Sequence, residues 1–410
     1  MFYGWVVVAT CFLINTIAFG SAYSFGVFLN PLRETFSASS AAVSGAYSLE
    51  LFLYTGLAVV WGLSVDRYGS RVTTMVGGAL LFTGLLLTSR VSALWQLYVT
   101  YGLIGMGVST SYSPLMATVS RWFDRQRGLA IGISSTGLGL GPVIVAPVAS
   151  YLIAIDSWRF AYFVMAFAAA LTIPAALLLK KSPHDTASLP HTGMPDSRVP
   201  PTTVKRDGAS PETVDLPLKQ AFRTRPFWLI SLMFLLVGMA LQIVIAHIVA
   251  YSQLKGISAM TAAAVLSTIT GASIAGRIIW GSVSDRIGRK KTLAICVLTE
   301  GTMIIWLMGA TSAWMLFLFA VIFGFGYGGH ATQFPALTGE IFGLRHMGAN
   351  LGGVVFFWGV GGAFGAAIAG HIFDVTGSYI SAFILGAAGM LAAGAITSLV
   401  KRPGKTPAAG

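Results

Sequence analysis

Twelve apolar runs, each long enough to cross a bilayer, dominate this sequence. A spanning helix needs about 20 mostly apolar residues, because the hydrocarbon core is about 30 Å thick. The strands of a membrane barrel would be short and alternating in polarity, and these runs are neither. The sequence therefore predicts an all-α membrane protein with twelve transmembrane helices, near 5–29, 43–64, 72–92, 94–118, 128–152, 159–179, 226–251, 262–284, 292–310, 313–338, 347–371 and 378–400.

The composition excludes several classes of function. Only 10% of the residues are charged, whereas a soluble domain carries roughly 25%. A soluble enzyme, a nucleic-acid binder and a disordered chain are therefore improbable despite the net charge of +12. Cys11 and Cys296 both lie in apolar runs and suggest neither a disulfide framework nor a metal site. No phosphate-binding loop or catalytic serine motif is found, so we expect no enzyme activity and no cofactor.

A single long polar stretch, Ser182–Arg225, divides the predicted helices six and six. It is rich in Pro, Thr, Asp and Lys and cannot bury a core. Its last part, Leu216–Arg225, is predicted to form a short surface helix. The predicted organisation is an N-terminal bundle over 1–180, a cytoplasmic linker over 181–225, a C-terminal bundle over 226–400 and a cytoplasmic tail over 401–410.

The distribution of Lys and Arg predicts the orientation in the membrane. With the N-terminus and the linker in the cytoplasm, 21 of the 26 basic residues lie on the cytoplasmic side, four lie outside and Arg277 lies within a helix. This bias follows the positive-inside rule. We therefore expect a multi-pass protein of the inner (plasma) membrane with both termini in the cytoplasm.

A short motif is repeated in the two halves. The pattern G-x-x-x-D-R-x-G-x-[RK] occurs twice, with its acidic residues at Asp66 and Asp285, 219 residues apart. The same offset relates Trp61 to Trp280. The two halves therefore read as parallel copies of one six-helix unit.

The repeated pattern resembles the signature loop of the major facilitator superfamily, although a tight basic turn would also explain each copy alone. The resemblance implies a major facilitator fold of two pseudo-symmetric six-helix bundles, a binding site between them near the midplane, and a monomer. It also implies that Asp66, Arg67, Asp285 and Arg286 act in gating rather than in substrate binding.

Further motifs narrow the resemblance. The segments Tyr3-Gly-Trp-Val-Val-Val8, Arg225-Pro-Phe-Trp228 and Ala275-Gly-Arg277-Ile-Ile-Trp-Gly281 are similar to those of monocarboxylate transporters and the related oxalate/formate exchangers. In that group an Arg at the place of Arg277 binds the carboxylate of the substrate. The resemblance extends over both halves outside the linker.

Arg277 is a functional candidate on physical grounds as well. It lies eight residues before Asp285, hence about 12 Å from the cytoplasmic end of its helix. A guanidinium at that depth is costly unless it faces a cavity or a partner, and its planar fork suits a carboxylate. The alternative is a structural ion pair with an intramembrane acid such as Glu50 or Glu300.

The number of intramembrane cations predicts the charge of the ligand. Arg277 is the only Lys or Arg that we place at mid-membrane, and Met347–His371 contains neither residue. Oxalate exchangers, which this chain resembles, carry a second cation there. We therefore expect a short monocarboxylate such as L-lactate or pyruvate. An organic-anion exchanger of the oxalate/formate type and a receptor-like protein without turnover remain alternatives.

The mode of coupling departs from the animal monocarboxylate transporters. Those carry a Lys where Tyr23 stands and an Asp where Ser273 stands. Proton symport is still expected, because an anion entering alone would work against a negative-inside potential by about 2.3 kcal/mol per 100 mV.

The proton then needs a titratable residue. His247, with an ordinary pKa of about 6.5, is our first hypothesis for this role and Glu50 is the second. Glu300 is expected to be protonated or paired, and His330 to be structural. The substrate pocket is predicted to include hydroxyl and ring contacts from six aromatic residues, namely Tyr327, Tyr112, Tyr23, Phe25, Phe356 and Phe357.

Overall fold

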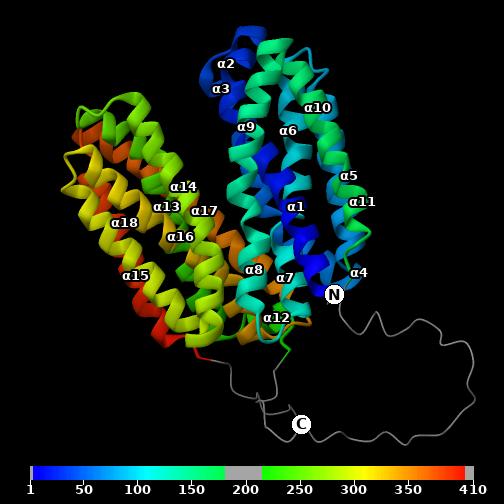
Figure 1. Cartoon of the computed structure of the whole chain (residues 1–410), viewed down its shortest axis with the longest axis vertical. Coiled ribbons are helices and arrows are strands. Elements are labelled where there is room, and N and C mark those ends of the chain that lie inside the picture. The colour runs from blue at the N-terminus through cyan, green and yellow to red at the C-terminus, as the bar shows by residue number, and fades with distance from the viewer. Residues whose placement is uncertain (1–2, 181–214, 402–410) are drawn as a thin grey trace, which may run out of the picture.

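The computed structural model of the chain describes residues 3–180 and 215–401, and the regular secondary structure in these ranges is helical. The helices form two bundles (Figure 1). The first contains α1 (Tyr3–Tyr23), α2 (Phe25–Phe36), α3 (Ser40–Gly56), α4 (Ala58–Tyr68), α5 (Ser70–Thr88), α6 (Leu94–Val108), α7 (Ser113–Trp122), α8 (Arg127–Ser135), α9 (Gly137–Ile155), α10 (Trp158–Ala170) and α11 (Thr172–Ala176). The second contains α12 (Leu218–Ala221), α13 (Arg225–Leu254), α14 (Ala259–Ile287), α15 (Arg289–Met308), α16 (Ala313–Phe342), α17 (Met347–Thr376) and α18 (Ile380–Leu399).

The spans agree with the predicted helices, with one difference in continuity. Within the described residues, ten helical stretches are long and apolar enough to cross a membrane, and α3 with α4, bent by 43°, makes an eleventh. The remaining predicted span, 94–118, is divided into α6 and α7. Its residues are helical on either side of a short break, so the twelve-helix fold is retained.

Hydroxyl groups account for the break between α6 and α7. The Ser109 Oγ donates to the Tyr54 carbonyl at 2.7 Å, and the Thr110 Oγ1 donates to the Gly107 carbonyl at 2.8 Å. Such bonds offer the backbone carbonyls partners other than the helical N–H groups. Pro114 then stands in the first turn of α7, where its missing N–H costs no helical hydrogen bond.

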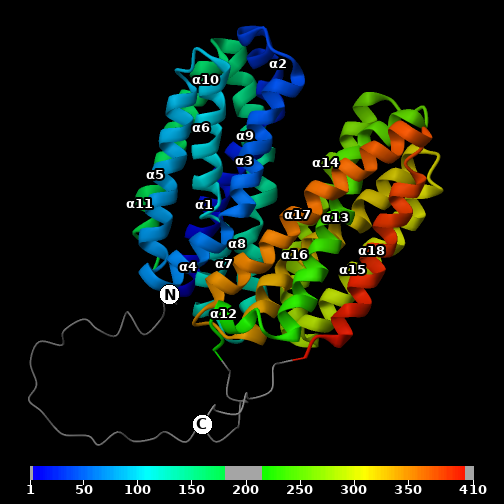
Figure 2. The ribbon, with the colours of Figure 1, turned by 180° about the vertical axis from the view of Figure 1, so that it is seen from behind.

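The two bundles diverge toward one end of the molecule and meet at the other (Figures 1 and 2). The start of α1, the end of α18 and the short helix α12 all lie at the end where the bundles meet. The predicted helix before the second bundle is confirmed by α12, and its neighbour Leu216 is buried. Most of the predicted linker, residues 181–214, and the tail from 402 lie outside the described residues.

Glycines allow the backbones of the two bundles to approach closely along two lines of contact. Between α4 and α17, a Cβ at Gly62 would collide with the carbonyl of Gly348, and one at Gly352 would collide with the carbonyl of Ala58. Small residues at such positions let membrane helices pack backbone to backbone.

The second line of contact joins α8 to α14. A Cβ at Gly128 would collide with the carbonyl of Gly281, and one at Gly132 with that of Arg277. The two lines of contact, which we call the glycine seams, therefore join the bundles at related places in the repeat.

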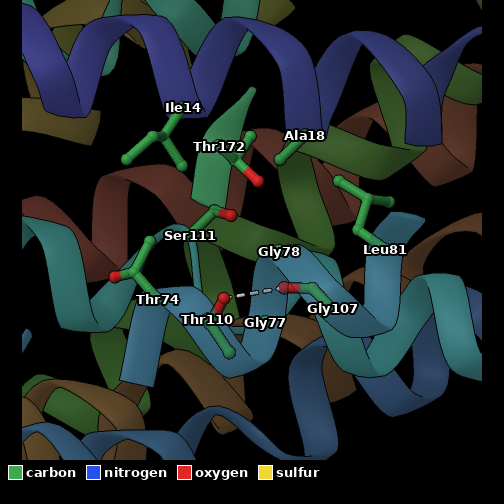
Figure 3. A pocket seen from close by; sticks show the side chains of 10 residues that line it. All are labelled: Ile14, Ala18, Thr74, Gly77, Gly78, Leu81, Gly107, Thr110, Ser111 and Thr172. Atoms are coloured by element: carbon green, nitrogen blue, oxygen red, sulfur yellow. Dashed lines mark hydrogen bonds between the residues drawn. The ribbon is translucent and has the colours of Figure 1, made fainter. Parts of the chain in front are cut away.

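Glycines also close the packing inside the first bundle, between α5 and α6 (Figure 3). A Cβ at Gly107 would lie 2.8 Å from the Gly77 carbonyl and 2.7 Å from the Leu81 amide nitrogen. Both contacts are with backbone, which cannot move aside as a flexible side chain can. The space between these helices is therefore filled by the close approach itself.

We predict that Gly107→Ala destabilises the protein by about 1–3 kcal/mol, the usual cost of overpacking. Thermal unfolding in detergent, followed by tryptophan fluorescence, would show a lowered midpoint. Gly271→Ala is the matched control, because Gly271 also lies within a helix and an added Cβ there would have no neighbour within 4 Å. An unchanged midpoint for Gly107→Ala would contradict the backbone contact.

Candidate functional site

Arg277 is buried at the boundary between the bundles. Its side chain is 1% exposed, and its backbone carbonyl faces Gly132 across the second glycine seam. The guanidinium carbon lies 5.5 Å from the centre of the Tyr327 ring, within the range of a cation–π contact. The Nε and Nη1 atoms have no hydrogen-bond partner in the part of the chain that the structure describes.

Neither of the two intramembrane acids neutralises Arg277. The Glu300 Oε1 lies 2.7 Å from the Nδ1 of His330, so Glu300 is paired as predicted. Glu50 is 2% exposed and its Oε1 has no partner among the described residues. Neither acid forms an ion pair with Arg277 in residues 3–180 and 215–401. A buried cation without a protein anion favours an anionic ligand.

Tyrosines from both bundles surround the Arg277 charge. Tyr23 at the end of α1, Tyr54 in α3 and Tyr112 before α7 are all close enough to Arg277 to interact with it electrostatically. The Tyr112 hydroxyl donates to the Ala331 carbonyl of the other bundle at 3.2 Å. The structure thus places Tyr23, Tyr112 and Tyr327 near Arg277, and their contact with substrate stays a prediction.

Tyr54 was missed by the sequence analysis. It stands four residues after Glu50, one helical turn along the same face. That spacing is the signal that could have found it. The contact of its ring with Phe19, at 5.5 Å between centroids, could not be predicted from the sequence.

The three phenylalanines predicted to line the substrate pocket contact aromatic residues other than the tyrosines around Arg277. Phe25 stacks on Tyr47 at 4.6 Å and is buried in the first bundle. Phe357 packs against Phe356 at 5.7 Å and against Trp228 at 5.8 Å. The ring contacts found for these side chains are with neighbouring aromatic residues and not with Arg277.

His247 connects two helices of the second bundle. Its Nε2 lies 3.1 Å from the Ala366 carbonyl in α17. A carbonyl only accepts, so the Nε2 carries the hydrogen of this contact. The ring also packs on Tyr379, 5.0 Å between centroids.

Asp66 joins the bundles at the closed end of the first glycine seam. Its Oδ1 accepts from the Gly348 amide at 3.1 Å and its Oδ2 from the Ala349 amide at 2.8 Å. A carboxylate at the N-terminus of α17 is stabilised by the helix dipole. The Arg121 Nη2 binds the same carboxylate at 2.5 Å, and its Nε donates to the Leu344 carbonyl at 3.0 Å.

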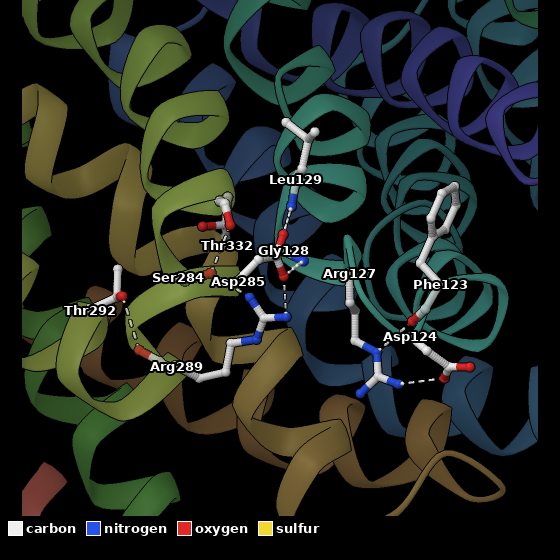
Figure 4. Close-up of polar contacts among 12 residues, drawn as sticks. Phe123, Asp124, Arg127, Gly128, Leu129, Ser284, Asp285, Arg289, Thr292 and Thr332 are labelled. Atoms are coloured by element: carbon white, nitrogen blue, oxygen red, sulfur yellow. Dashed lines mark hydrogen bonds and ion pairs between the residues drawn. The ribbon is translucent and has the colours of Figure 1, made fainter.

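Asp285 makes the related contact at the second seam (Figure 4). Its two carboxylate oxygens accept from the amides of Gly128 at 3.0 Å and Leu129 at 3.1 Å, at the start of α8. Arg289, one helical turn further along the chain, pairs with the same carboxylate. Each motif aspartate therefore caps a helix of the opposite bundle.

The predicted gating arginines lie beside this arrangement. Arg67 and Arg286 are both exposed, and the Arg67 guanidinium lies over the Tyr68 ring at 5.2 Å. The carboxylates are instead paired with Arg121 and Arg289, which the sequence analysis did not single out. The four-residue spacing of Asp285 and Arg289 was a usable signal, whereas Arg121 comes from a distant helix and no local pattern points to it.

Comparison with known proteins identifies the family. The sequence profile of the Major Facilitator Superfamily matches residues 11–279 and 256–410. The chain belongs to this superfamily. It is a transporter rather than an enzyme, and the predicted fold of two six-helix bundles is confirmed.

Relatives narrow the group. Monocarboxylate transporter 12 of Homo sapiens is 30% identical to this chain, over 98% of the chain and 82% of the relative. The oxalate:formate antiporter of Oxalobacter formigenes is 28% identical, over 89% of the chain and 85% of the relative. The chain thus falls in the monocarboxylate and oxalate–formate group of the superfamily, as its motifs indicated.

Solved structures share the fold at low identity. The fucose:proton symporter of E. coli superimposes with a TM-score of 0.75 at 14% identity, covering 98% of this chain and 100% of the other. A proton:xylose symporter gives 0.74 at 13% identity, covering 97% and 94%. At these identities the likeness supports the fold alone.

We predict that Asp66→Asn loosens the contact between α4 and α17, because an amide weakens the charge-assisted bonds to the α17 N-terminus and to Arg121. Spin labels on the exposed residues Tyr68 and Arg345, each changed to Cys in a variant with Cys11 and Cys296 replaced by Ser, would report longer distances. Arg125→Gln is the control, since Arg125 is exposed and is not one of the predicted gating residues. Unchanged distances in Asp66→Asn would rule out this role.

Proposed function

We propose that this transporter carries a short monocarboxylate, such as L-lactate or pyruvate, together with a proton by alternating access. The observation that carries the proposal is Arg277, a buried guanidinium at the boundary of the bundles with two N–H groups unpartnered among the described residues. A carboxylate would accept from these unpartnered N–H donors and neutralise the charge. The names of several relatives, monocarboxylate transporters 12 and 13, agree with that class of substrate.

The count of fixed charges supports a monoanion. Helix α17 carries no Lys or Arg over Met347–Thr376, so a second carboxylate would have no cation on that helix. One cation and one carboxylate give a neutral site. A neutral site can be sealed inside low dielectric at far lower cost than a charged one.

Around the carboxylate we propose hydroxyl contacts from Tyr327, Tyr112 and Tyr23. In this structure the Tyr112 hydroxyl donates a hydrogen bond to the Ala331 carbonyl of the other bundle. If the hydroxyl donated to the bound substrate instead, substrate binding would remove one contact between the bundles. Phe25, Phe356 and Phe357 are proposed to shape the pocket through the rings that they contact.

Opening and closing would use the two glycine seams. We propose that Asp66, Arg67, Asp285 and Arg286 belong to the gate at the end where the bundles meet, and that this end faces the cytoplasm of the cell. The proposed setting is the plasma (inner) membrane, with a monomer whose two termini are cytoplasmic. In this arrangement the ends at which the bundles diverge would face the outside.

The proton is proposed to enter with the anion, and His247 and Glu50 are the two carriers that the sequence nominates. The contact of His247 with α17 is made by its Nε2, so its Nδ1 is the nitrogen proposed to bind the proton. An organic-anion exchanger is the second candidate function. The similarity to an oxalate:formate antiporter favours it.

Uptake of labelled L-lactate into proteoliposomes tests the proposal. With the outside acidified by one pH unit, the wild type is expected to accumulate lactate about tenfold, since one pH unit supports a tenfold ratio per proton. Arg277→Gln is expected to reduce uptake at least a hundredfold, because the amide has no charge for the carboxylate. Protein-free liposomes give the background.

Two results would overturn this proposal. Wild-type rates in Arg277→Gln would remove the carboxylate from that residue. Uptake that requires an anion preloaded inside, whatever the pH gradient, would favour the exchanger.

We further predict that dicarboxylates compete poorly. Oxalate is expected to inhibit lactate uptake at least tenfold less well than pyruvate, because its second carboxylate would be buried without a cation. Inhibition constants measured with the wild type under the same gradient check this. Equal inhibition by the two anions would contradict the charge count.

A further inference from the structure

The only buried ion pair in the middle of a bundle, within the described residues, joins His330 of α16 to Glu300 of α15. The His330 Nδ1 and the Glu300 Oε1 lie 2.7 Å apart, and the two side chains are 2% and 0% exposed. The second carboxylate oxygen, Oε2, has no partner among residues 3–180 and 215–401. The pair is therefore a half-satisfied polar group inside the membrane span, where such groups are costly and commonly functional.

The pair is connected to the proposed carboxylate site through one aromatic ring. The Tyr327 ring centre lies 5.5 Å from the Arg277 guanidinium carbon and 5.5 Å from the His330 ring centre. Gly328 allows this proximity, because a Cβ there would lie 2.7 Å from the Arg277 amide nitrogen. Only the Tyr327 side chain separates the pair from Arg277, and the surroundings have a low dielectric constant. A change of charge on the pair therefore changes the electrostatic potential at Arg277.

Few other titratable groups face the pair. Cys296 on α15 interacts with the Glu300 charge, and Tyr327 is the neighbour on α16. From α14 the facing charge is Arg277, and α13 contributes the uncharged ring of Phe234 against Phe334. Helix α18, which packs on α15, carries no titratable side chain over Ile380–Leu399. The charge balance of this region therefore rests on Arg277 and the pair.

We infer that the His330–Glu300 pair, and not His247 or Glu50, binds the co-transported proton; the inference rests on the proposed symport. Without substrate, Arg277 carries one positive charge and the deprotonated pair one negative charge, so the empty carrier is neutral. With anion and proton both bound, Arg277 is neutralised by the carboxylate and the pair by the proton. Glu50, which has no cationic partner among the described residues, enters this balance as a neutral acid.

The same balance explains why neither solute would move alone. With only the proton bound, Arg277 is left as a net positive charge, and with only the anion bound, the pair is left as a net negative one. Sealing either charge between the bundles carries a desolvation cost of several kcal/mol. The proton would come from water on one side, reside on the pair, and leave to water on the other side.

Glu300→Gln separates this inference from the alternatives, because the amide keeps the shape and a hydrogen bond to His330 but cannot titrate. The variant mimics the protonated pair, so the loaded carrier is neutral and the empty carrier is positive. We expect lactate-for-lactate exchange within about twofold of the wild type and gradient-driven accumulation reduced at least tenfold. A pH indicator outside the vesicles should record about one proton taken up per lactate in the wild type and none in the variant.

Two further variants complete the experiment. Glu34→Gln, a change of the same kind at an exposed residue of α2, is expected to keep both activities. His330→Gln removes the imidazole that shares the proton with Glu300, and it is expected to lose gradient-driven accumulation at least tenfold as well. This second change keeps the inference testable should Glu300→Gln fail to fold.

Four results would overturn the inference. If Glu300→Gln or His330→Gln retained gradient-driven accumulation, the proton site would lie elsewhere although the symport would still hold. If His247→Gln alone abolished the coupling to the proton, His247 would be the proton site instead. A folded Glu300→Gln that loses exchange together with accumulation would make the pair a structural support. Absence of gradient-driven uptake in the wild type would remove the symport itself, and the proton site with it.

Discussion

Two carboxylates hold this molecule in its observed shape, each placed at the N-terminus of a helix that belongs to the other bundle. Asp66 accepts from the amides that begin α17, and Asp285 from those that begin α8. The bonds require backbones in near contact, which Gly62 and Gly128 permit. Everything beyond the seams is free to diverge, and Figure 1 shows the bundles doing so. The access to Arg277 thus depends on interactions made at the far end of the helices.

Arg277 and the His330–Glu300 pair together describe how charge is managed inside the bundles. An arginine in this position would be a liability in a static protein, because no described carboxylate neutralises it. In the proposed function the missing anion is the transported carboxylate. The buried His330–Glu300 pair also lies next to Tyr327. When it is deprotonated, this pair provides a negative charge near the positive charge of Arg277. In the proposed cycle a few side chains would account for the change of buried charge, and the two bundles would supply the scaffold around them.

Much of the fold could be predicted from the sequence, because membrane-spanning helices are read from the length and polarity of single segments. The duplication was equally visible, since Asp66 and Asp285 stand in the same motif. Arg277 could be found because a charge in an apolar run contrasts with its neighbours. Contacts between distant helices could not be found in this way. Arg121 reaches Asp66 from another helix, and Tyr54 approaches Arg277 across the bundle boundary. Pairing of Glu300 was expected, but its partner His330 follows from the packing of α15 on α16.

The two motif aspartates are paired with arginines at positions that the repeat does not relate. The 219-residue offset that relates the motifs places Glu340 where Arg121 would recur, and Ser70 where Arg289 would. Each ion pair nevertheless lies within one half, Asp66 with Arg121 in the first and Asp285 with Arg289 in the second. The two halves therefore supply the cation for their aspartate from different positions, so the repeat of the motif is not matched by a repeat of its ion pair.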